Sequence, residues 1–258
     1  LRYEPVSDLI IRLAWSNTLA RPKFKDSAIR RETNIEDEEV KVGNPDLNPY
    51  ESVNWDFSVE YYYEPLGLLS VSLFRKDISQ FIYDQKIENG IEVGGVDFRL
   101  ESPQNGQDAE ITGIELAWQQ ELSMVADVLS GFSIYANATF SDGDANIGTR
   151  MVPLLKHSET VYTLALSFEK WGFYTKLAGT YRSDYLDTVG GTQIEDEIIN
   201  GNFQLDLNVE YDVTKDFTVY AEAINLTNEP KRTNYGSGNL RQYEAYSWGL
   251  KAGVKWSF

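Results

Sequence analysis

Apolar and polar residues alternate along most of this chain. In residues 202–212, NFQLDLNVEYD, every odd-numbered residue is apolar and every even-numbered residue is polar. The same two-residue period occurs in residues 53–63, VNWDFSVEYYY, and in residues 131–141, GFSIYANATFS. A β-strand directs successive side chains to opposite faces, so this period predicts strands whose two faces meet different surroundings.

Seven further segments show the alternation less regularly and are also predicted to be extended. They are residues 9–20, 68–83, 110–121, 159–169, 172–186, 217–226 and 243–258. The sequence therefore predicts ten strands, and residues 1–4 fit the end of an eleventh. Apolar residues do not recur at the three- and four-residue spacing of a helix, so the chain is predicted to be all-β.

The connections between these strands alternate between short and long. The short ones span residues 4–8, 64–67, 122–131, 170–172 and 212–216, and the long ones span roughly residues 21–51, 84–109, 142–158, 187–201 and 227–242. An antiparallel up-and-down sheet with tight turns at one end and long loops at the other gives this order. Outer-membrane β-barrels are built in this way, with the short turns on the periplasmic side. With that orientation the tenth strand ends on the periplasmic side.

The period alone does not distinguish a soluble β-sandwich from a transmembrane barrel, but strand length and aromatic placement favour the barrel. Segments such as residues 243–258 are longer than the ~5–6 residues usual in globular sheets and reach the ~9–11 that cross a bilayer at a tilt. Aromatic residues lie near strand ends in the apolar register, as an interfacial girdle requires: Trp15, Trp55, Tyr61, Trp118, Tyr181, Tyr211, Trp248 and Trp256.

Five carboxylates lie in the opposite, polar register: Asp56, Glu60, Glu115, Asp206 and Glu210. In a water-filled lumen these groups cost little, whereas facing lipid they would each cost several kcal/mol. This placement again favours a barrel with an apolar exterior and a polar interior.

Composition excludes several other classes of function. The chain has 258 residues, with 23 Lys and Arg against 40 Asp and Glu, and a formal net charge of −17. A nucleic-acid partner is not expected, because neutralising phosphates needs a basic surface. There is no cysteine and a single histidine, His157, which we expect at the surface near the end of a loop. We therefore predict no catalytic residue, no metal site and no cofactor.

Residues 42–82 resemble a segment typical of TonB-dependent outer-membrane receptors, in which a G-N-P-x-L-x-P turn precedes an aromatic strand and a strand ending near K-D-I. The matching residues are Gly43, Asn44, Pro45, Leu47, Pro49, Lys76, Asp77 and Ile78. Residues 111–122, ITGIELAWQQEL, are similar to the family's G-x-E strand, and residues 224–230, INLTNEP, are similar to its N-L-x-N/D motif. The likeness covers essentially the whole chain.

This resemblance implies a 22-stranded barrel that encloses an N-terminal plug, with a TonB box that couples to an inner-membrane motor. Residues 1–258 contain neither part, so we expect them to be the C-terminal portion of the barrel domain, about its last ten strands. Ten such strands cannot close and would leave two unpaired edges. The last residues and ARPKF at 20–24 resemble a branch that often handles carbohydrates.

The resemblance also assigns a role to the end of the chain. In the family, a C-terminal aromatic strand is read by the barrel-assembly machinery. Val254, Trp256 and Phe258 share one row of the last predicted strand and are expected to form this signal. Phe258 would also serve as an interfacial anchor.

Two segments near the predicted extracellular mouth combine aromatic residues, arginine and glycine: GTYRSDY at 179–185 and NYGSGNLRQY at 234–243. Aromatic stacking together with Arg and Asp hydrogen bonds can hold a sugar or an anionic chelate. The candidate ligand-binding residues are Arg182, Asp184, Tyr185, Tyr235 and Arg241, and their alternative role is anchoring in the aromatic belt.

The sequence therefore predicts an outer-membrane receptor that takes up a scarce nutrient by TonB-coupled active transport. The nutrient would be a siderophore, cobalamin or an oligosaccharide, with carbohydrate slightly favoured. Its expected partners are the TonB-type coupling system, the barrel-assembly machinery, outer-membrane lipid and the ligand. The alternatives are a passive porin, a soluble β-sandwich binding module and, last, an outer-membrane enzyme barrel.

Overall fold

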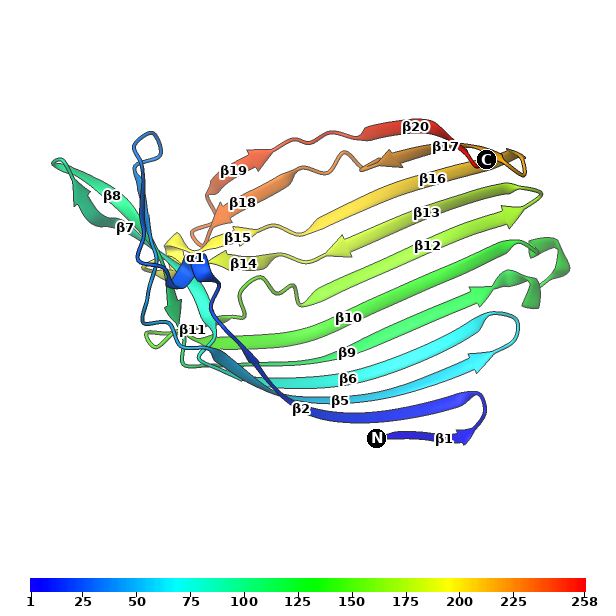
Figure 1. Ribbon diagram of the computed structural model, residues 1–258, viewed down its shortest axis with the longest axis horizontal. Helices are drawn as coiled ribbons and strands as arrows, with labels where there is room; N and C mark the ends of the chain where they lie inside the picture. Colours follow the sequence, from blue (N-terminus) through cyan, green and yellow to red (C-terminus); the bar gives the residue numbers. More distant parts are fainter.

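Eleven antiparallel strands follow one another across a single sheet in the computed structural model, which describes residues 1–258 (Figure 1). The strands are β1 (Arg2–Val6), β2 (Leu9–Ala20), β5 (Tyr50–Tyr63), β6 (Gly67–Ser79), β9 (Asp108–Glu121), β10 (Phe132–Asn146), β12 (Thr160–Lys170), β13 (Phe173–Arg182), β16 (Asn202–Thr214), β17 (Phe217–Ile224) and β20 (Gly249–Trp256). Each pairs with the next in this order, and β1 and β20 are the two free edges. The predicted all-β, up-and-down architecture is confirmed, including the eleventh strand at the N-terminus.

The remaining strands form two smaller sheets at one end of the large one. The first loop sheet has the order β3 (Arg31–Asn34), β4 (Glu39–Val42), β8 (Val96–Asn105) and β7 (Ile82–Val93). The second loop sheet has the order β14 (Tyr185–Thr188), β15 (Glu197–Ile199), β18 (Lys231–Tyr235) and β19 (Leu240–Glu244). A short strand, β11 (Met151–Pro153), pairs with the far end of β10. The long connections are thus built largely of strands.

Short helical turns complete the fold: α1 (Phe24–Ser27), η1 (Leu122–Met124), η2 (Asp127–Leu129) and η3 (Gln193–Glu195). None of the helices is both long enough and apolar enough to span a bilayer. The short turns and the C-terminus lie together at the end of the large sheet opposite the loop sheets (Figure 1). We call these two ends the turn end and the loop end.

Strand register keeps apolar residues aligned across the sheet. One continuous row of directly paired residues runs through seven strands: Val59, Val71, Leu116, Ala138, Tyr162, Tyr181 and Phe203. The row offset by one residue, on the opposite face, is mostly polar: Arg12, Ser58, Ser72, Glu115, Thr139, Val161, Arg182 and Asn202. A slip of one residue in any pair would exchange the two faces, so this register is strongly specified.

The two faces have the character that the alternation predicts. The apolar face exposes large side chains, among them the predicted girdle residues Trp15, Trp55, Tyr61, Trp118, Tyr211 and Trp256. On the polar face three of the five predicted carboxylates have side-chain partners: Glu60 pairs with Arg12, Glu210 accepts from Lys255 at 2.7 Å, and Asp206 accepts from Gln204 at 2.8 Å.

Three predicted strands were too long, and each breaks where it enters a loop sheet. The segment 68–83 divides at Gln80, whose φ of 55° ends β6 before β7 begins. The segment 243–258 divides at Ser247, whose φ is 62°, so residues 243–244 belong to β19. The segment 172–186 divides between β13 and β14 at residues 183–184. At Gln80 and Ser247 the positive φ interrupts the extended strand without interrupting the hydrophobic alternation, so the sequence period does not show these two breaks.

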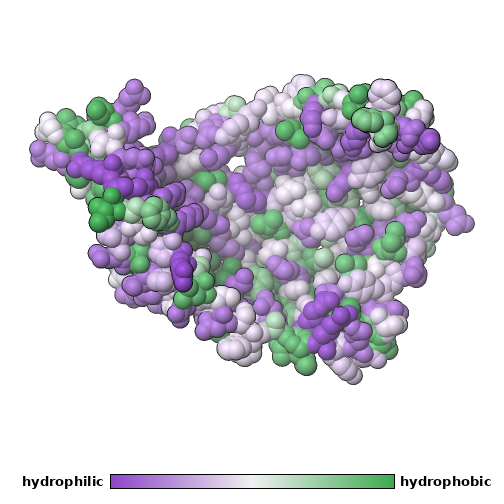
Figure 2. All heavy atoms as spheres, in the orientation of Figure 1, coloured by the Kyte–Doolittle hydropathy of each residue, from purple (hydrophilic) through white to green (hydrophobic).

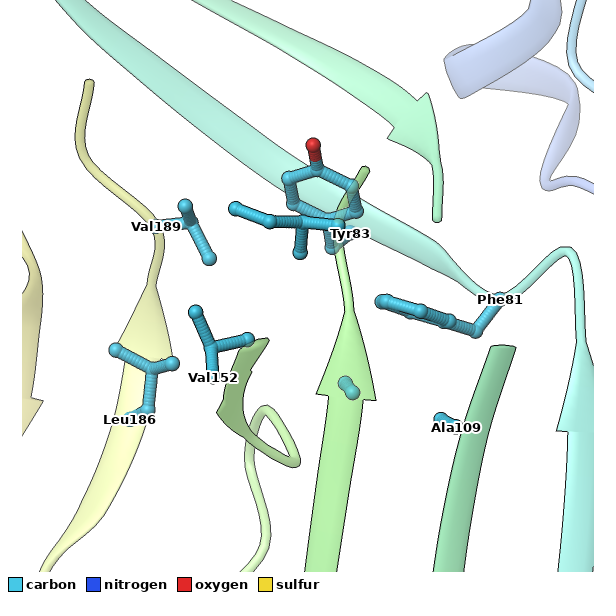
Figure 3. Close-up of a cluster of buried hydrophobic side chains, with 8 residues drawn as sticks. Phe81, Tyr83, Ala109, Val152, Leu186 and Val189 are labelled. Atoms are coloured by element: carbon cyan, nitrogen blue, oxygen red, sulfur yellow. The ribbon is translucent and has the colours of Figure 1, made fainter. Parts of the chain in front are cut away.

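The loop end has a small hydrophobic core of its own. Its buried residues are Phe81, Tyr83, Ala109, Ala145, Ile147, Val152, Leu186 and Val189. Figure 3 shows Val152 on β11 facing Leu186 on β14, with Val189 and the ring of Tyr83 closing over them. Residues from three separate connections therefore pack together with the ends of β9 and β10, which holds these loops in one arrangement.

Glycines in the large sheet make room for aromatic rings on neighbouring strands. A Cβ on Gly113 of β9 would lie 2.5 Å from Cζ of Phe74 on β6, and a Cβ on Gly253 of β20 would lie 2.7 Å from Oη of Tyr220 on β17. The ring covers the glycine backbone and pins the register, as described for aromatic rescue of strand glycines.

We predict that Gly113→Val destabilises the sheet by about 1–3 kcal/mol, because the new side chain overlaps the ring of Phe74 and Cβ of Ser141 and forces them to move. The fraction of folded protein should be followed by heat-modified migration on gels across a temperature series. The double variant Phe74→Ala/Gly113→Val should recover part of the loss. Equal stability of Gly113→Val and the parent protein would contradict this account of the pair.

Candidate ligand-binding site

Backbone bonds join the two loop sheets into one layer. Gln85 on β7 forms a parallel bridge with Val189, directly after β14, and the Lys86 amide donates to the Val189 carbonyl at 2.9 Å. The order of strands across the loop end is therefore continuous from β8 through β7 to β14 and β15. Hydrophilic residues gather over this end of the molecule (Figure 2).

A chain of ion pairs crosses the same junction. Glu197 on β15, with a side chain 6% exposed, lies 3.2 Å from Nζ of Lys86 on β7 and 2.9 Å from Nε of Arg241 on β19. Lys86 lies 3.7 Å from Glu101, which also accepts from Lys41 at 3.2 Å. Because these groups are half-buried or buried, their pairing is screened by water less than at an open surface.

The chain continues into β4. Glu39 lies 3.2 Å from Lys41 and 3.5 Å from Arg99. Burial by itself raises the pKa of Glu39, yet Lys41, Arg99 and Lys86 together hold that pKa below its ordinary value. The ion-pair chain therefore belongs to the folded structure of the loop end.

A cavity of about 310 Å³ opens between β10, β11, the start of β12 and the second loop sheet. Its polar lining includes His157, Glu159, Asp184, Tyr185, Gln193 and Asp196. These residues come from two of the long connections, and Gly236 adds a third; they meet only because the large sheet places the connections side by side. This cavity is the candidate ligand-binding site.

His157 lies at the end of a connection, as predicted, but it is half-buried rather than on the surface. Its Nε2 is 3.2 Å from Oγ of Ser141, and its ring packs beside Gly143. Burial lowers the pKa of His157 below its ordinary value and outweighs the carboxylates of Glu159 and Asp142, which raise it. The imidazole is therefore neutral at pH 7.

The structure places the five predicted ligand-binding residues in or beside the second loop sheet. Asp184 and Tyr185 line the cavity, and Tyr235 precedes Gly236, which also lines it. Arg182 stacks on Tyr185, with its guanidinium carbon 4.8 Å from the ring centre, and Arg241 is paired with Glu197. Both predicted arginines are therefore engaged within the protein.

Sequence reasoning missed Glu159, Gln193 and Asp196 and gave His157 no part in the site. Single acidic or amide residues in polar loops carry no distinctive spacing. Their common location depends on strand pairing between distant segments, which no local motif reports.

The predicted assembly residues lie at the turn end. Val254 and Trp256 are exposed on the apolar face of β20, and Phe258 follows the strand, fully exposed. The Ser257 amide donates to the Asp216 carbonyl at 3.0 Å, which fixes the end of the chain beside the β16–β17 turn. Their role as an assembly signal stays a prediction.

The apolar outward face, the polar opposite face and the up-and-down order define a sheet of a transmembrane β-barrel. The family model for TonB-dependent receptor-like β-barrels matches residues 1–226. The chain belongs to the β-barrel family of TonB-dependent receptors, which are proteins of the bacterial outer membrane, and the predicted resemblance is confirmed.

Solved structures of low sequence identity share the fold. The copper transporter OprC aligns with a TM-score of 0.70 at 14% identity over 100% of this chain and 39% of its own. A ferric enterobactin receptor variant from Pseudomonas aeruginosa aligns with a TM-score of 0.67 at 14% identity, over 100% of this chain and 39% of its own. The siderophore receptor PirA from Acinetobacter baumannii aligns with a TM-score of 0.66 at 12% identity, over 100% of this chain and 40% of its own.

The chain thus spans about two fifths of the length of these structures. No curated protein sequence matches it significantly. The matched family consists of receptors and transporters, and the low identities leave the ligand open.

We predict that Glu197→Gln loosens the loop end by roughly 3 kcal/mol, because it leaves Arg241 without its partner and Lys86 with only Glu101. Hydrogen exchange of β15 and β19 should rise accordingly. Glu88→Gln is the matched control, because Glu88 is 48% exposed and lies 3.8 Å from Arg99 at the margin of the same chain. Similar exchange in the two variants would show that Glu197 does not organise the junction.

A second prediction follows from the lowered pKa of His157. As pH falls below the ordinary histidine pKa of about 6.5, the unfolded segment takes up a proton more readily than the folded one, so the folded loop loses stability. Protection factors of residues 154–158 should drop between pH 7 and pH 5.5 in the parent protein. His157→Gln should show a smaller drop, since the neighbouring carboxylates titrate in both proteins. An identical drop of the protection factors in both proteins would show that protonation of His157 does not cause the loss of stability.

Proposed function

We propose that the protein is a receptor for TonB-coupled uptake of a scarce nutrient across the outer membrane. Residues 1–258 would be the C-terminal portion of its barrel domain. The observation that carries the proposal is the ordered layer at the loop end and the cavity that it contains. This layer lies at one end of the large sheet, whose polar face would line the interior of the barrel. In this proposal the protein binds and transports its nutrient without making or breaking a covalent bond.

Transport would proceed by binding at the extracellular loop end, rearrangement of a plug and passage into the periplasm. The energy would come through a TonB-type system that contacts a part of the protein outside residues 1–258. Outer-membrane lipid would cover the apolar face, and the barrel-assembly machinery would read Val254, Trp256 and Phe258.

The ligand class is part of the same proposal. Relatives of this fold are named for ferric enterobactin, siderophore and copper transport. We favour an oligosaccharide over an anionic chelate, because the two arginines suited to an anion are engaged by Glu197 and by Tyr185. Acceptor groups in the cavity suit the hydroxyl donors of a sugar.

The test is energy dependence of uptake by cells that express the full-length protein. Labelled chitotriose, glucosamine trisaccharide, ferric enterobactin and cobalamin serve as probes. Uptake of a bound probe should fall to background when TonB is deleted or a protonophore is added. The purified full-length protein should show little conductance in a planar bilayer.

A passive porin would behave differently in both assays. Uptake would persist without TonB, and the bilayer would show stable open channels. Either result would contradict the proposed function.

A further inference from the structure

Three neighbouring turns at the turn end carry large apolar side chains that the protein leaves uncovered. They are Leu66 between β5 and β6, Met124, Val125 and Val128 between β9 and β10, and Trp171 between β12 and β13. These five residues, which we call the apolar rim, are between 55% and 84% exposed. Because the strands pair in the order β5, β6, β9, β10, β12 and β13, the three turns follow one another along the edge of the sheet (Figure 1).

Contacts of the first two turns place them against the apolar face. Gln120 lies in the apolar register of β9, two residues after Trp118, and it is 2% exposed. Its Nε2 donates to the Pro65 carbonyl at 3.4 Å and to the Glu121 carbonyl at 2.8 Å. The turn that carries Leu66 is therefore tied to the apolar side of β9, directly before the turn that carries Met124, Val125 and Val128.

The third turn lies on the same face. The ring centre of Trp171 is 6.2 Å from that of Phe168, and Phe168 packs with its ring centre 4.7 Å from that of Phe132 on β10. Phe132 and Phe168 pair directly across β10 and β12 in the apolar register. The apolar rim therefore begins and ends beside side chains of the apolar face.

The rim extends the apolar face past its aromatic boundary. Tyr61, Tyr63 and Trp118 lie in the apolar register close to the turn end, and Nε1 of Trp118 donates to Oη of Tyr63 at 3.2 Å. In a membrane barrel such a girdle marks the level of the lipid head groups. Polar residues follow at the turn between β16 and β17, which contains Lys215 and Asp216, whereas aliphatic residues follow at the rim.

We propose that the apolar rim inserts into the membrane leaflet at the turn end and binds the acyl chains of its phospholipids. The rim is continuous with the face that meets lipid in a membrane barrel, and moving its side chains from water into hydrocarbon is favourable. The exposed carboxylates of Glu64 and Asp127 lie on the same turns and limit the depth of insertion, because they remain among the head groups.

The boundary of the lipid is therefore uneven around this part of the barrel. It extends past the aromatic girdle at the three turns of the rim and does not reach the turn between β16 and β17. This inference concerns the outer surface of the barrel and does not depend on the nutrient or on energy coupling.

Spin labelling of the purified full-length receptor in phospholipid vesicles tests the proposal. A nitroxide is attached at Val128→Cys and, as the matched control, at Lys215→Cys, whose native side chain is 89% exposed in the polar turn. Residues 1–258 contain no cysteine, and any cysteine elsewhere in the receptor is replaced by serine. Heat-modified migration on gels verifies folding, and Val125→Cys takes the place of a Val128 variant that does not fold.

The collision rates of each label with dissolved oxygen, which concentrates in hydrocarbon, and with a water-soluble nickel complex report its surroundings. The ratio of the oxygen rate to the nickel rate should be severalfold higher at residue 128 than at residue 215. Equal ratios at the two positions would show that the rim faces water and would overturn the proposal. Protection of residue 128 from both reagents would show that protein covers the rim, and would overturn it as well.

Discussion

Backbone hydrogen bonding between neighbouring strands is the constraint on which the rest of this structure depends. Inside a bilayer no water is available to an unpaired amide or carbonyl, so each membrane strand must find both partners in the protein. Every strand from β2 to β17 in the large sheet has a hydrogen-bonded neighbour on both sides. The alternation of apolar and polar side chains fixes the register between these neighbours. The apolar row through Val59, Leu116 and Phe203 and the polar row through Ser58, Glu115 and Asn202 are two consequences of that one pairing.

The same ladder determines what the long connections can do. Because each hairpin returns to the loop end beside its neighbour, connections far apart in the sequence meet there without any long-range motif. Gln85 reaches Val189, Lys86 reaches Glu197, and Ile147 shares a core with Leu186. The loop end is thus an ordered layer with its own hydrophobic core and buried ion pairs, and the cavity is held between elements that are already fixed. A preorganised site of this kind spends less binding free energy on ordering loops.

Membrane strands could be predicted from the sequence because their signal is local. Residues 9–20 were predicted as a strand, and β2 spans Leu9–Ala20. The breaks at Gln80 and Ser247 could not be predicted, since they depend on backbone dihedrals that leave the alternation intact. Only part of the candidate site could be predicted from the sequence. Asp184 and Tyr185 stood out in an aromatic segment, whereas Asp196 and Glu159 are ordinary polar loop residues until strand pairing gathers them around one cavity. Arg241 was predicted to bind the ligand, but its partner Glu197 lies in a different connection, so its ion pair within the protein could not be predicted from the sequence.

Charge balance at the loop end depends on the burial of each acidic group. In the ion-pair chain, the carboxylates of Glu39, Glu101 and Glu197 are matched by Lys41, Lys86, Arg99 and Arg241, and this matching is what makes their burial tolerable. Around the cavity, the buried carboxylate of Asp196 is likewise matched by Arg150, whereas Glu159 and Asp184 are exposed to solvent. The chain as a whole has a net charge of −17, and exposed carboxylates such as Glu159 and Asp184 can carry that excess without a protein cation because water hydrates them. Burial therefore decides which acidic groups at the loop end require a cationic partner.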